Sequence, residues 1–302
     1  MLPRNQEKIK KIPKSGFLRP KTPKSTSQPK GAFFTSAWDR ADLSTFFYVP
    51  VQKFDPANLY PEPKPSYHRF RYRKGETPDD VFEKYHTPLQ IAIDDEGAEI
   101  LHDDHTALLT KREVETCELF RDHPHRNIAN YRGVVYSSSL RYGHPSGEIH
   151  VPFDTERILK LVFKRYDCTL WQLVTHHQAV NVKQCLESIA AGIMHMHSRG
   201  MVHGDVKPKN IFASAEEGKD PKHSLLYVIG DFDSTHKTGS RIKLKSGDLK
   251  WTRRKRSGDF AEEDDDWYAF NMVKEWLLKS TGAKLSDLEG IGKNVVKGKG
   301  RR

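Results

Sequence analysis

The most regular alternation of apolar and polar positions in the chain lies in residues 181–200. Leu186, Ile189 and Ile193 recur at intervals of three and four, the spacing that places side chains on one face of an α-helix. Gly200 follows the last turn, where a glycine commonly ends a helix. The pattern therefore predicts a helix with one buried face.

Shorter patterns predict strands before this helix and another helix after it. Residues 157–166 alternate like a strand, and residues 225–229 form a short apolar run that leads into acids. Residues 111–120 are typical of a helix, and residues 267–279 follow three acids that suit the positive end of a helix dipole. Strands early and helices late predict an α+β fold with a small front lobe and a helical rear lobe.

Three other stretches carry no helical period. Residues 88–93 alternate like a strand, and turn-forming residues separate them from 99–101, so we expect a small hairpin there. Residues 137–156 are punctuated by Gly and Pro, and we expect an exposed insertion. Residues 31–75 are rich in aromatics and prolines, and we expect them to pack on a domain rather than to form one.

Composition favours an intracellular, soluble protein. Of the 302 residues, 36% are hydrophobic and 30% are charged, which is enough apolar chain to bury a core. Three cysteines cannot all pair, and no run of about 18 apolar residues could span a bilayer. We therefore expect a monomer of the cytoplasm or nucleus without a membrane span.

The net charge of +10 is concentrated in two tails. Residues 1–30 carry +8 and residues 291–302 carry +5, so the rest of the chain carries −3. Because residues 1–30 are rich in Lys, Pro, Ser and Thr, we expect a disordered arm there. Its charge suits nucleic acid, an acidic membrane or a nuclear import receptor, although charge runs are usually solvated.

Candidate chemistry follows directly after the predicted buried helix. The segment HGDVKPKN contains Asp205, Lys207 and Asn210, and Asp231 follows the next apolar run. Phosphoryl transfer needs such a set: a carboxylate for the hydroxyl proton, a cation beside the phosphate, and an amide with a second carboxylate to hold Mg²⁺. Each residue alone is more often a turn or cap residue, but their joint spacing is specific.

These segments resemble the protein kinase superfamily, over about residues 85–280, and are most similar to divergent fungal kinase-like proteins. The resemblance implies ATP and Mg²⁺ as cofactors and a Ser or Thr of a protein as acceptor. It implies Asp205 as the catalytic base and Lys207 beside the transferred phosphate. Asn210 and Asp231 take the positions of the metal ligands.

The same resemblance assigns positions in the front lobe. REVETCELF implies that Glu113, with Glu115 as second choice, pairs with a nucleotide-binding lysine. LVFKRYDCTLWQLV is similar to the hinge, which makes Phe163 the gatekeeper and Tyr166 a nucleotide contact. Asp266 is similar to the acid that hydrogen-bonds the backbone of the catalytic loop.

Departures from the family pattern predict a degenerate front lobe. No G-x-G-x-x-G occurs upstream of residue 111, and no lysine stands about 15 to 20 residues before Glu113, where the family has one. Lys111 is better explained as a helix-surface partner of Glu115. Gly204 replaces the Arg of H-R-D, and Asp233 replaces the Gly of D-F-G.

The predicted organisation has four parts. They are a basic tail (1–30), an irregular extension (31–84), a kinase-like domain (85–280, with an N-lobe to about 165 and a shortened C-lobe from about 166), and a basic C-terminal tail (281–302). A protein kinase is the leading hypothesis, and a pseudokinase that scaffolds partners is the alternative. A small-molecule phosphotransferase is third, and a nucleic-acid binder that uses its basic tails is fourth.

Overall fold

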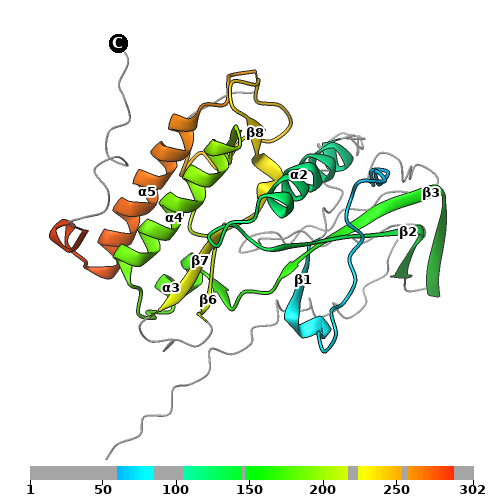
Figure 1. Ribbon diagram of the computed structural model, residues 1–302, viewed down its shortest axis with the longest axis horizontal. Coiled ribbons are helices and arrows are strands. Elements are labelled where there is room, and N and C mark those ends of the chain that lie inside the picture. The colour runs from blue at the N-terminus through cyan, green and yellow to red at the C-terminus, as the bar shows by residue number, and fades with distance from the viewer. Residues whose placement is uncertain (1–59, 85–104, 145–146, 217–223, 254–257, 289–302) are drawn as a thin grey trace, which may run out of the picture. The chain divides into compact units, whose positions relative to one another are not determined.

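A computed structural model describes residues 60–84, 105–144, 147–216, 224–253 and 258–288. The helices are α2 (His105–Asp122), α3 (Leu170–Thr175), α4 (Val182–Ser198) and α5 (Glu263–Thr281), with 3₁₀ turns η2 (Pro78–Asp80), η3 (Phe232–Ser234) and η4 (Leu285–Leu288). The strands are β1 (Val81–Lys84), β2 (Tyr131–His144), β3 (Gly147–Lys164), β4 (Cys168–Thr169), β5 (Met201–Val202), β6 (Ile211–Ala215), β7 (Leu225–Ile229) and β8 (His236–Lys237). The described chain is therefore α+β, as predicted (Figure 1).

The front part is an antiparallel sheet in the order β1-β3-β2. Phe82 of β1 lies opposite Phe163 of β3, and Val134 of β2 lies opposite Leu161. Val134 and Leu161 are fully buried in one apolar core with Val114 of α2. Helix α2 is thereby held against the sheet, and the charged side chains on both elements are brought close together.

The irregular structure predicted at 137–156 is wrong, because residues 137–144 extend β2 and residues 147–156 extend β3. The two strands pair from Tyr131 to His144 and from Gly147 to Phe163, with register shifts at three points. Antiparallel pairing satisfies backbone N–H and C=O groups regardless of side-chain polarity, and bulges absorb irregular spacing. Gly143, Gly147 and Pro152, which suggested a loop, lie within the paired strands.

The predicted buried helix at 181–200 is confirmed as α4. The Asn181 side chain accepts a hydrogen bond from the Gln184 N–H and caps the helix start. Leu186, Ile189 and Ile193 are buried, and α4 packs beside α5 (Figure 1). This pair of helices forms the base on which the loops of the candidate site rest.

Helix α5 begins four residues earlier than predicted. The acids expected to precede it lie in its first turn, and Glu262 and Asp265 cap the helix reciprocally. At the other end, Gly282 has a φ of 73° and closes the helix. The predicted C-terminal tail contributes to the fold at its start, because Leu288 of η4 is buried.

The front sheet also extends beyond the predicted N-terminal boundary at residue 85. Strand β1 belongs to the irregular extension predicted for 31–84, yet it pairs with β3. His68 and Phe70 exchange backbone hydrogen bonds with Val134 on the other side of the sheet. Helix α2 likewise begins at His105 rather than 111. The hairpin expected at 88–101 and the arm at 1–30 lie outside the described residues.

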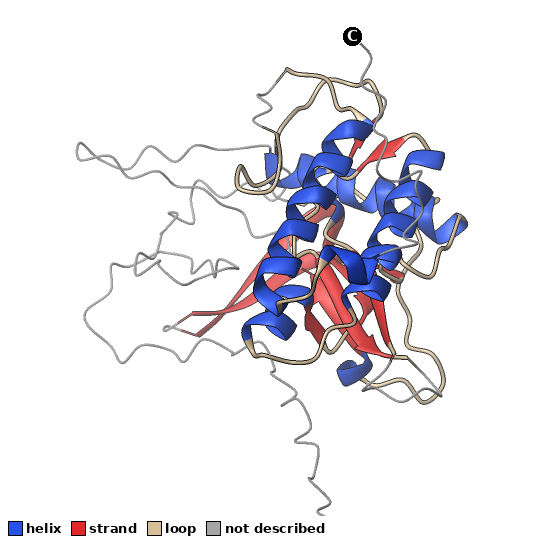
Figure 2. Ribbon diagram, turned by 90° about the vertical axis from the view of Figure 1, so that its left-hand side faces the viewer, coloured by secondary structure: helices blue, strands red, loops and turns tan. Residues whose placement is uncertain are grey.

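Two small sheets position the catalytic loop. One has the order β4-β6-β7, and the other pairs β5 with β8. The loop between β5 and β6 contains Asp205, and Asp231 follows β7. The described parts of the connection from β8 to α5 are loop rather than helix or strand (Figure 2). No helix in the described part of the chain is long and apolar enough to cross a membrane.

Candidate active site

Asp266 of α5 anchors the catalytic loop, which lies between β5 and β6. Its carboxylate accepts hydrogen bonds from the backbone N–H groups of His203 (2.8 Å) and Gly204 (2.9 Å). The Nε2 atom of His197 lies 2.9 Å from the same carboxylate. Asp266 is fully buried, so these bonds replace its hydration. The expected contact between Asp266 and the catalytic loop is confirmed.

Both carboxylate oxygens of Asp205 are engaged. Oδ2 lies 2.9 Å from the Lys207 ammonium and accepts a 3.1 Å hydrogen bond from the Asn210 amide. Oδ1 accepts a 2.8 Å hydrogen bond from the backbone N–H of Asp248. The structure therefore brings Asp205, Lys207 and Asn210 together, and a distant loop reaches them as well. Asp205 has no exposed surface.

Two glycines allow this loop to approach so closely. A Cβ at Gly247 would lie 2.1 Å from the carbonyl oxygen of Gly204, so no larger residue fits without displacing the backbone. Gly204 has a φ of 76°, and a Cβ there would lie 2.9 Å from the carbonyl oxygen of Ser234. The glycine that replaces the usual Arg is thus required by the local backbone.

Lys84 lies at the centre of a second group of charged side chains, between the front sheet and the segment that follows β7. Its ammonium is 2.7 Å from Glu113 Oε2, forms a close ion pair with Asp231 and lies 3.8 Å from Asp233 Oδ2. The sequence-based conclusion that no lysine was available to pair with Glu113 is therefore wrong. Lys84 ends strand β1, which places it opposite α2 across the front lobe.

Lys84 was missed because it lies 29 residues before Glu113, farther than the family spacing. Residues 85–104, between β1 and α2, are outside the described residues. The sequence does contain a lysine near a short apolar run: residues 81–84 read VFEK, with Glu83 between the apolar pair and Lys84.

The charges in this cluster stabilise one another. Burial would lower the pKa of Lys84, but Asp231, Glu113 and Asp233 outweigh it and hold that pKa well above its usual value. Burial would likewise raise the pKa of Asp231, but Lys84 and Lys245 hold it well below its usual range. Lys84 is therefore a cation and Asp231 an anion.

Glu113 joins α2 to the segment around Asp231. Besides Lys84, it accepts a 3.1 Å hydrogen bond from the backbone N–H of Phe232. Glu113 is fully buried, so its position is fixed by these partners. Glu115, the second choice, pairs instead with Lys64 and Tyr67, and this replaces the partnership with Lys111 that its spacing suggested.

Asp233, at the position where the family has glycine, is tied to the loop that follows. Lys245 donates to both carboxylate oxygens of Asp233 at 2.7 Å. Arg112 of α2 donates to the backbone oxygens of Asp233 (3.2 Å) and Lys243 (2.6 Å). The left-handed backbone conformation falls on Asp231, with a φ of 68°, so Asp233 needs no such conformation.

Phe163 and Tyr166 lie near the end of the front sheet. Phe163 is buried, with its ring centroid 5.7 Å from that of Tyr131. The Tyr166 hydroxyl accepts a 3.0 Å hydrogen bond from the Asn130 N–H, and its ring stacks on Phe212. Both residues therefore pack at the junction between β3 and the β4-β6-β7 sheet, and their predicted nucleotide contacts stay predictions.

The donor set at Asn210 and Asp231 fits Mg²⁺, which prefers carboxylate and amide oxygens. The Asn210 NH₂ group points to Asp205, so the amide oxygen is the atom that would meet a cation. The backbone N–H of Gly230 donates to the backbone carbonyl of Asn210 and holds the two segments side by side. No three His, Cys, Asp or Glu side chains cluster as a metal site within the described ranges.

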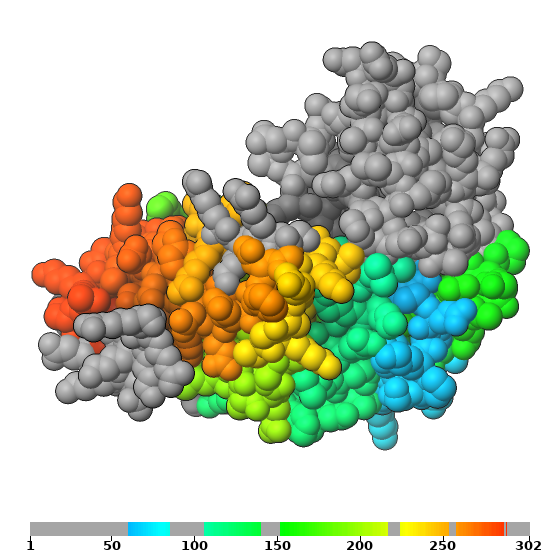
Figure 3. Space-filling model, turned by 90° about the horizontal axis from the view of Figure 1, so that it is seen from above, coloured from blue at the N-terminus to red at the C-terminus, as the bar shows by residue number. Residues whose placement is uncertain are grey.

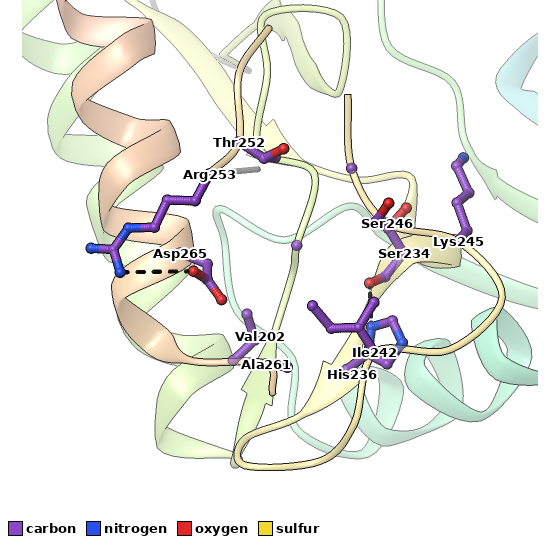
Figure 4. A pocket seen from close by; sticks show the side chains of 12 residues that line it. Val202, Ser234, His236, Ile242, Lys245, Ser246, Thr252, Arg253, Ala261 and Asp265 are labelled. Carbon is purple, nitrogen blue, oxygen red and sulfur yellow. Dashed lines mark hydrogen bonds and ion pairs between the residues drawn. The ribbon is translucent and has the colours of Figure 1, made fainter. Parts of the chain in front are cut away.

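A pocket opens on the other side of the catalytic loop (Figure 4). Its volume is about 380 Å³ with the part open to solvent, and it lies between β5, β8 and the start of α5. Arg253 and Asp265 face each other at its rim, 4.0 Å apart. None of the residues predicted to bind ATP or metal lines this pocket. Lys245 lines the pocket and pairs with Asp233, so the pocket borders the cluster around Lys84.

Fold and site together define the class. A front sheet with a Lys–Glu ion pair, a loop with Asp, Lys and Asn, and an Asp after the next strand form the arrangement that kinases use around ATP. The protein kinase domain family matches residues 100–252, about half of the chain. The chain belongs to the protein kinase domain family.

Relatives with individual names agree with this class. The chain is similar to serine/threonine-protein kinase SBK1 of Danio rerio, with 29% identity over 32% of this chain and 25% of the relative. It is similar to sporulation protein kinase mde3 of Schizosaccharomyces pombe, with 30% identity over 40% of this chain and 23% of the relative. Each match spans a quarter of the relative's length or less.

Proposed function

We propose that this protein transfers the γ-phosphoryl group of ATP to Ser or Thr hydroxyls of a protein. The observation that carries the proposal is the position of Lys84 between Glu113 and Asp231. Lys84 supplies the phosphate-binding cation that the family spacing had failed to locate, and its apparent absence was the strongest argument against activity. The relative from Danio rerio is named as a serine/threonine-protein kinase, which supports the choice of acceptor.

Each residue has a role in this proposal. Bound MgATP supplies the phosphoryl group. Lys84, held by Glu113, contacts the nucleotide phosphates, while Asn210 and Asp231 hold the metal. Asp205 accepts the proton of the acceptor hydroxyl, and Lys207, 2.9 Å from Asp205, balances negative charge beside it.

The test is a matched pair of lysine substitutions in the full chain. Lys84→Met should reduce phosphorylation of a Ser/Thr peptide library by at least about a hundredfold, because it removes a preorganised cation. Lys111→Met removes an exposed lysine from α2 and should leave the rate within about twofold. If both variants match the wild type, the assignment of Lys84 is wrong.

A pseudokinase that acts as a scaffold is the second candidate, and the burial of Asp205 favours it. The Asp248 N–H occupies one carboxylate oxygen, and Lys207 and Asn210 occupy the other. ATP binding that depends on Mg²⁺, without phosphate transfer to any peptide, protein or small hydroxyl compound, would establish this alternative. Turnover that is lost in Lys84→Met but kept in Lys111→Met would exclude it.

A further inference from the structure

Asp233 introduces a carboxylate where the kinase family has glycine, shortly after the predicted metal ligand Asp231. An acid at this position would repel the phosphates of a nucleotide, so its charge needs a partner. Asp233 has two such partners, because the ammonium groups of both Lys84 and Lys245 approach its carboxylate. The family arrangement accounts for Lys84, whereas it assigns nothing to Lys245.

The two lysines share one oxygen of Asp233. Asp233 Oδ2 lies 2.7 Å from the Lys245 ammonium and 3.8 Å from the Lys84 ammonium. Lys245 also donates to Oδ1 at 2.7 Å. A phosphate oxygen resembles a carboxylate oxygen in its negative charge and in the hydrogen bonds that it accepts from ammonium groups. Two ammonium groups that share one carboxylate oxygen are therefore close enough to share one phosphate group.

Lys245 is a cation whose electric field extends beyond Asp233. Burial would lower the pKa of Lys245, but Asp233 and Asp231 outweigh burial and raise that pKa. Burial would raise the pKa of Asp231, and Lys245 acts with Lys84 to hold it below its usual range. The charge of Lys245 is thus felt at the carboxylate proposed to hold Mg²⁺, beside which the phosphates of MgATP would lie.

Lys245 is the more accessible of the two lysines. Its side chain is 37% exposed, compared with 19% for Lys84. In Figure 3 residues 236–253 (yellow to orange), which include Lys245, lie at the surface beside α2. In Figure 4 the Lys245 side chain lies across the pocket from Arg253 and Asp265. A ligand can therefore reach the Lys245 ammonium from solvent.

A strained turn precedes Lys245. The Lys245 N–H donates to the Lys243 carbonyl at 2.9 Å, and Leu244 between them has a φ of 67°. This conformation costs energy for a residue other than glycine and is retained where the surroundings enforce it. Arg112 holds the turn by donating to the same carbonyl at 2.6 Å. The turn separates two neighbouring lysines, because Lys243 is exposed while Lys245 reaches Asp233.

Lys245 also lies between the proposed metal ligand and the proposed base. On one side it pairs with Asp233, which belongs to the turn η3 that follows Asp231. On the other side, the backbone N–H of Asp248 in the same segment donates to Asp205 at 2.8 Å. The phosphoryl group that a kinase transfers lies between the metal and the acceptor hydroxyl. The position of Lys245 therefore favours the terminal phosphate over the others.

The sequence leaves a role for such a cation, because no G-x-G-x-x-G, whose backbone amides would bind phosphates, occurs upstream of residue 111. We propose that Lys245 is a second phosphate-binding residue, which contacts the terminal phosphate of MgATP together with Lys84. Asp233 is a positioning residue that holds Lys245 beside the site. This inference rests on the proposed kinase function for the identity of the nucleotide, but it concerns binding and needs no turnover.

The first test is equilibrium binding of MgATP and MgADP to the full chain, measured by calorimetry. Lys245→Met should weaken MgATP binding about tenfold and leave MgADP within about twofold, because ADP lacks the terminal phosphate. Lys243→Met removes an exposed lysine from the same segment and should leave both affinities within about twofold. Equal affinity for MgATP in all three proteins, or equal losses for both nucleotides, would overturn the proposal.

A simpler role for Lys245 is to neutralise Asp233, and a second pair of variants separates the two roles. Asp233→Asn removes the charge and keeps the shape of the side chain. If Lys245 only neutralises Asp233, adding Lys245→Met to Asp233→Asn should cost no MgATP affinity. We expect a loss of about tenfold to remain, because the ammonium contacts the phosphate itself. Disappearance of the loss in the Asp233→Asn protein would overturn the proposal.

The outcomes also separate this inference from the proposed activity. If MgATP binding depends on Lys245 but no phosphate reaches any peptide, the phosphate contact stands and the proposed kinase activity falls. If peptides are phosphorylated while Lys245→Met binds MgATP as the wild type does, the contact falls and the activity stands. A wild type that binds neither nucleotide would overturn both. Circular dichroism melting checks that each variant folds, and Lys245→Gln replaces Lys245→Met if the latter does not.

Discussion

The two ends of the candidate site differ in how their charged side chains are paired. At the nucleotide end, defined by Lys84, Glu113 and Asp231, every charge has a partner from another element of the fold. At the acceptor end, one carboxylate oxygen of Asp205 accepts a hydrogen bond from a backbone N–H of residues 236–253, which hold six Lys or Arg and one acid and are called the basic loop. The first end is held by ion pairs between different elements, whereas at the second a backbone N–H covers one oxygen of the candidate base.

This difference follows from where each end is built. Lys84 and Glu113 lie on a strand and a helix that share a buried core, so packing holds them in place. The basic loop is held to the rest by the Lys245–Asp233 ion pair and by Arg112, which binds the Lys243 carbonyl. A few polar contacts are easier to release than a packed core.

The largest effect is expected at the acceptor end. Asp205→Asn keeps the shape of the side chain but removes the proton acceptor, so turnover should fall by about 10² to 10⁴. Because Lys84 and Asp231 remain in place, ATP affinity should not change. Initial rates and equilibrium binding of ATP separate the two quantities. Wild-type turnover in Asp205→Asn would show that the chemistry is assigned to the wrong residue.

A smaller but still large effect is expected where Asp266 supports the catalytic loop. Asp266→Ala leaves the buried N–H groups of His203 and Gly204 without an acceptor, which should cost about 3 kcal/mol of unfolding free energy. Asp264→Ala, at an exposed site in the same helical turn, serves as control and should cost less than about 1 kcal/mol. Urea unfolding measures both, and equal costs would contradict the anchoring role.

Releasing the basic loop should have a moderate effect. Lys245→Met removes the ion pair with Asp233, so the backbone N–H of Asp248 should exchange its hydrogen about tenfold faster. Lys237→Met alters an exposed lysine of the same loop that has no acidic partner in the described chain, and it should leave exchange unchanged. Hydrogen exchange read by mass spectrometry tests the pair. Unchanged exchange in Lys245→Met would mean that other contacts hold the loop.

The smallest effect is a difference in pH response between the two ends. Burial and Arg112 lower the pKa of His236, whose ring nitrogens lie within hydrogen-bonding distance of backbone groups of Ser234 and Lys243. Its contribution to stability is therefore complete above its unfolded pKa of about 6.5 and declines as the pH falls through that region. His236→Gln should accordingly lose less stability than the wild type between about pH 7 and pH 5.

The nucleotide end provides the control for this measurement. Because the pKa of Asp231 is held well below its usual range, its contribution is present above about pH 4 and is lost only in stronger acid. Asp231→Asn should therefore leave the change in stability between about pH 7 and pH 5 the same as in the wild type. Denaturant midpoints measured across that pH range test both expectations. Identical slopes for His236→Gln and the wild type would rule out His236 as the titrating group.

Local pattern was sufficient to identify most of the chemistry. Asp205, Lys207 and Asn210 lie within six residues, so their spacing already determined that they would meet in one loop. The apolar stripe of α4 predicted a buried helix because burial and helical periodicity are encoded in the same few turns. Asp266 and Glu113 were identified through motifs, and the structure gives both the expected type of partner.

Tertiary structure alone decided the contacts between distant segments. Lys84 meets Glu113 because β1 pairs with β3 while α2 packs on the same sheet, and neither fact follows from spacing along the chain. The long β2–β3 hairpin was missed because backbone pairing does not require apolar alternation. The contact of Asp248 with Asp205 depends on a close approach that two glycines permit. Such long-range contacts are selected by the packing of the whole domain, whereas local spacing specifies only which residues are available to make them.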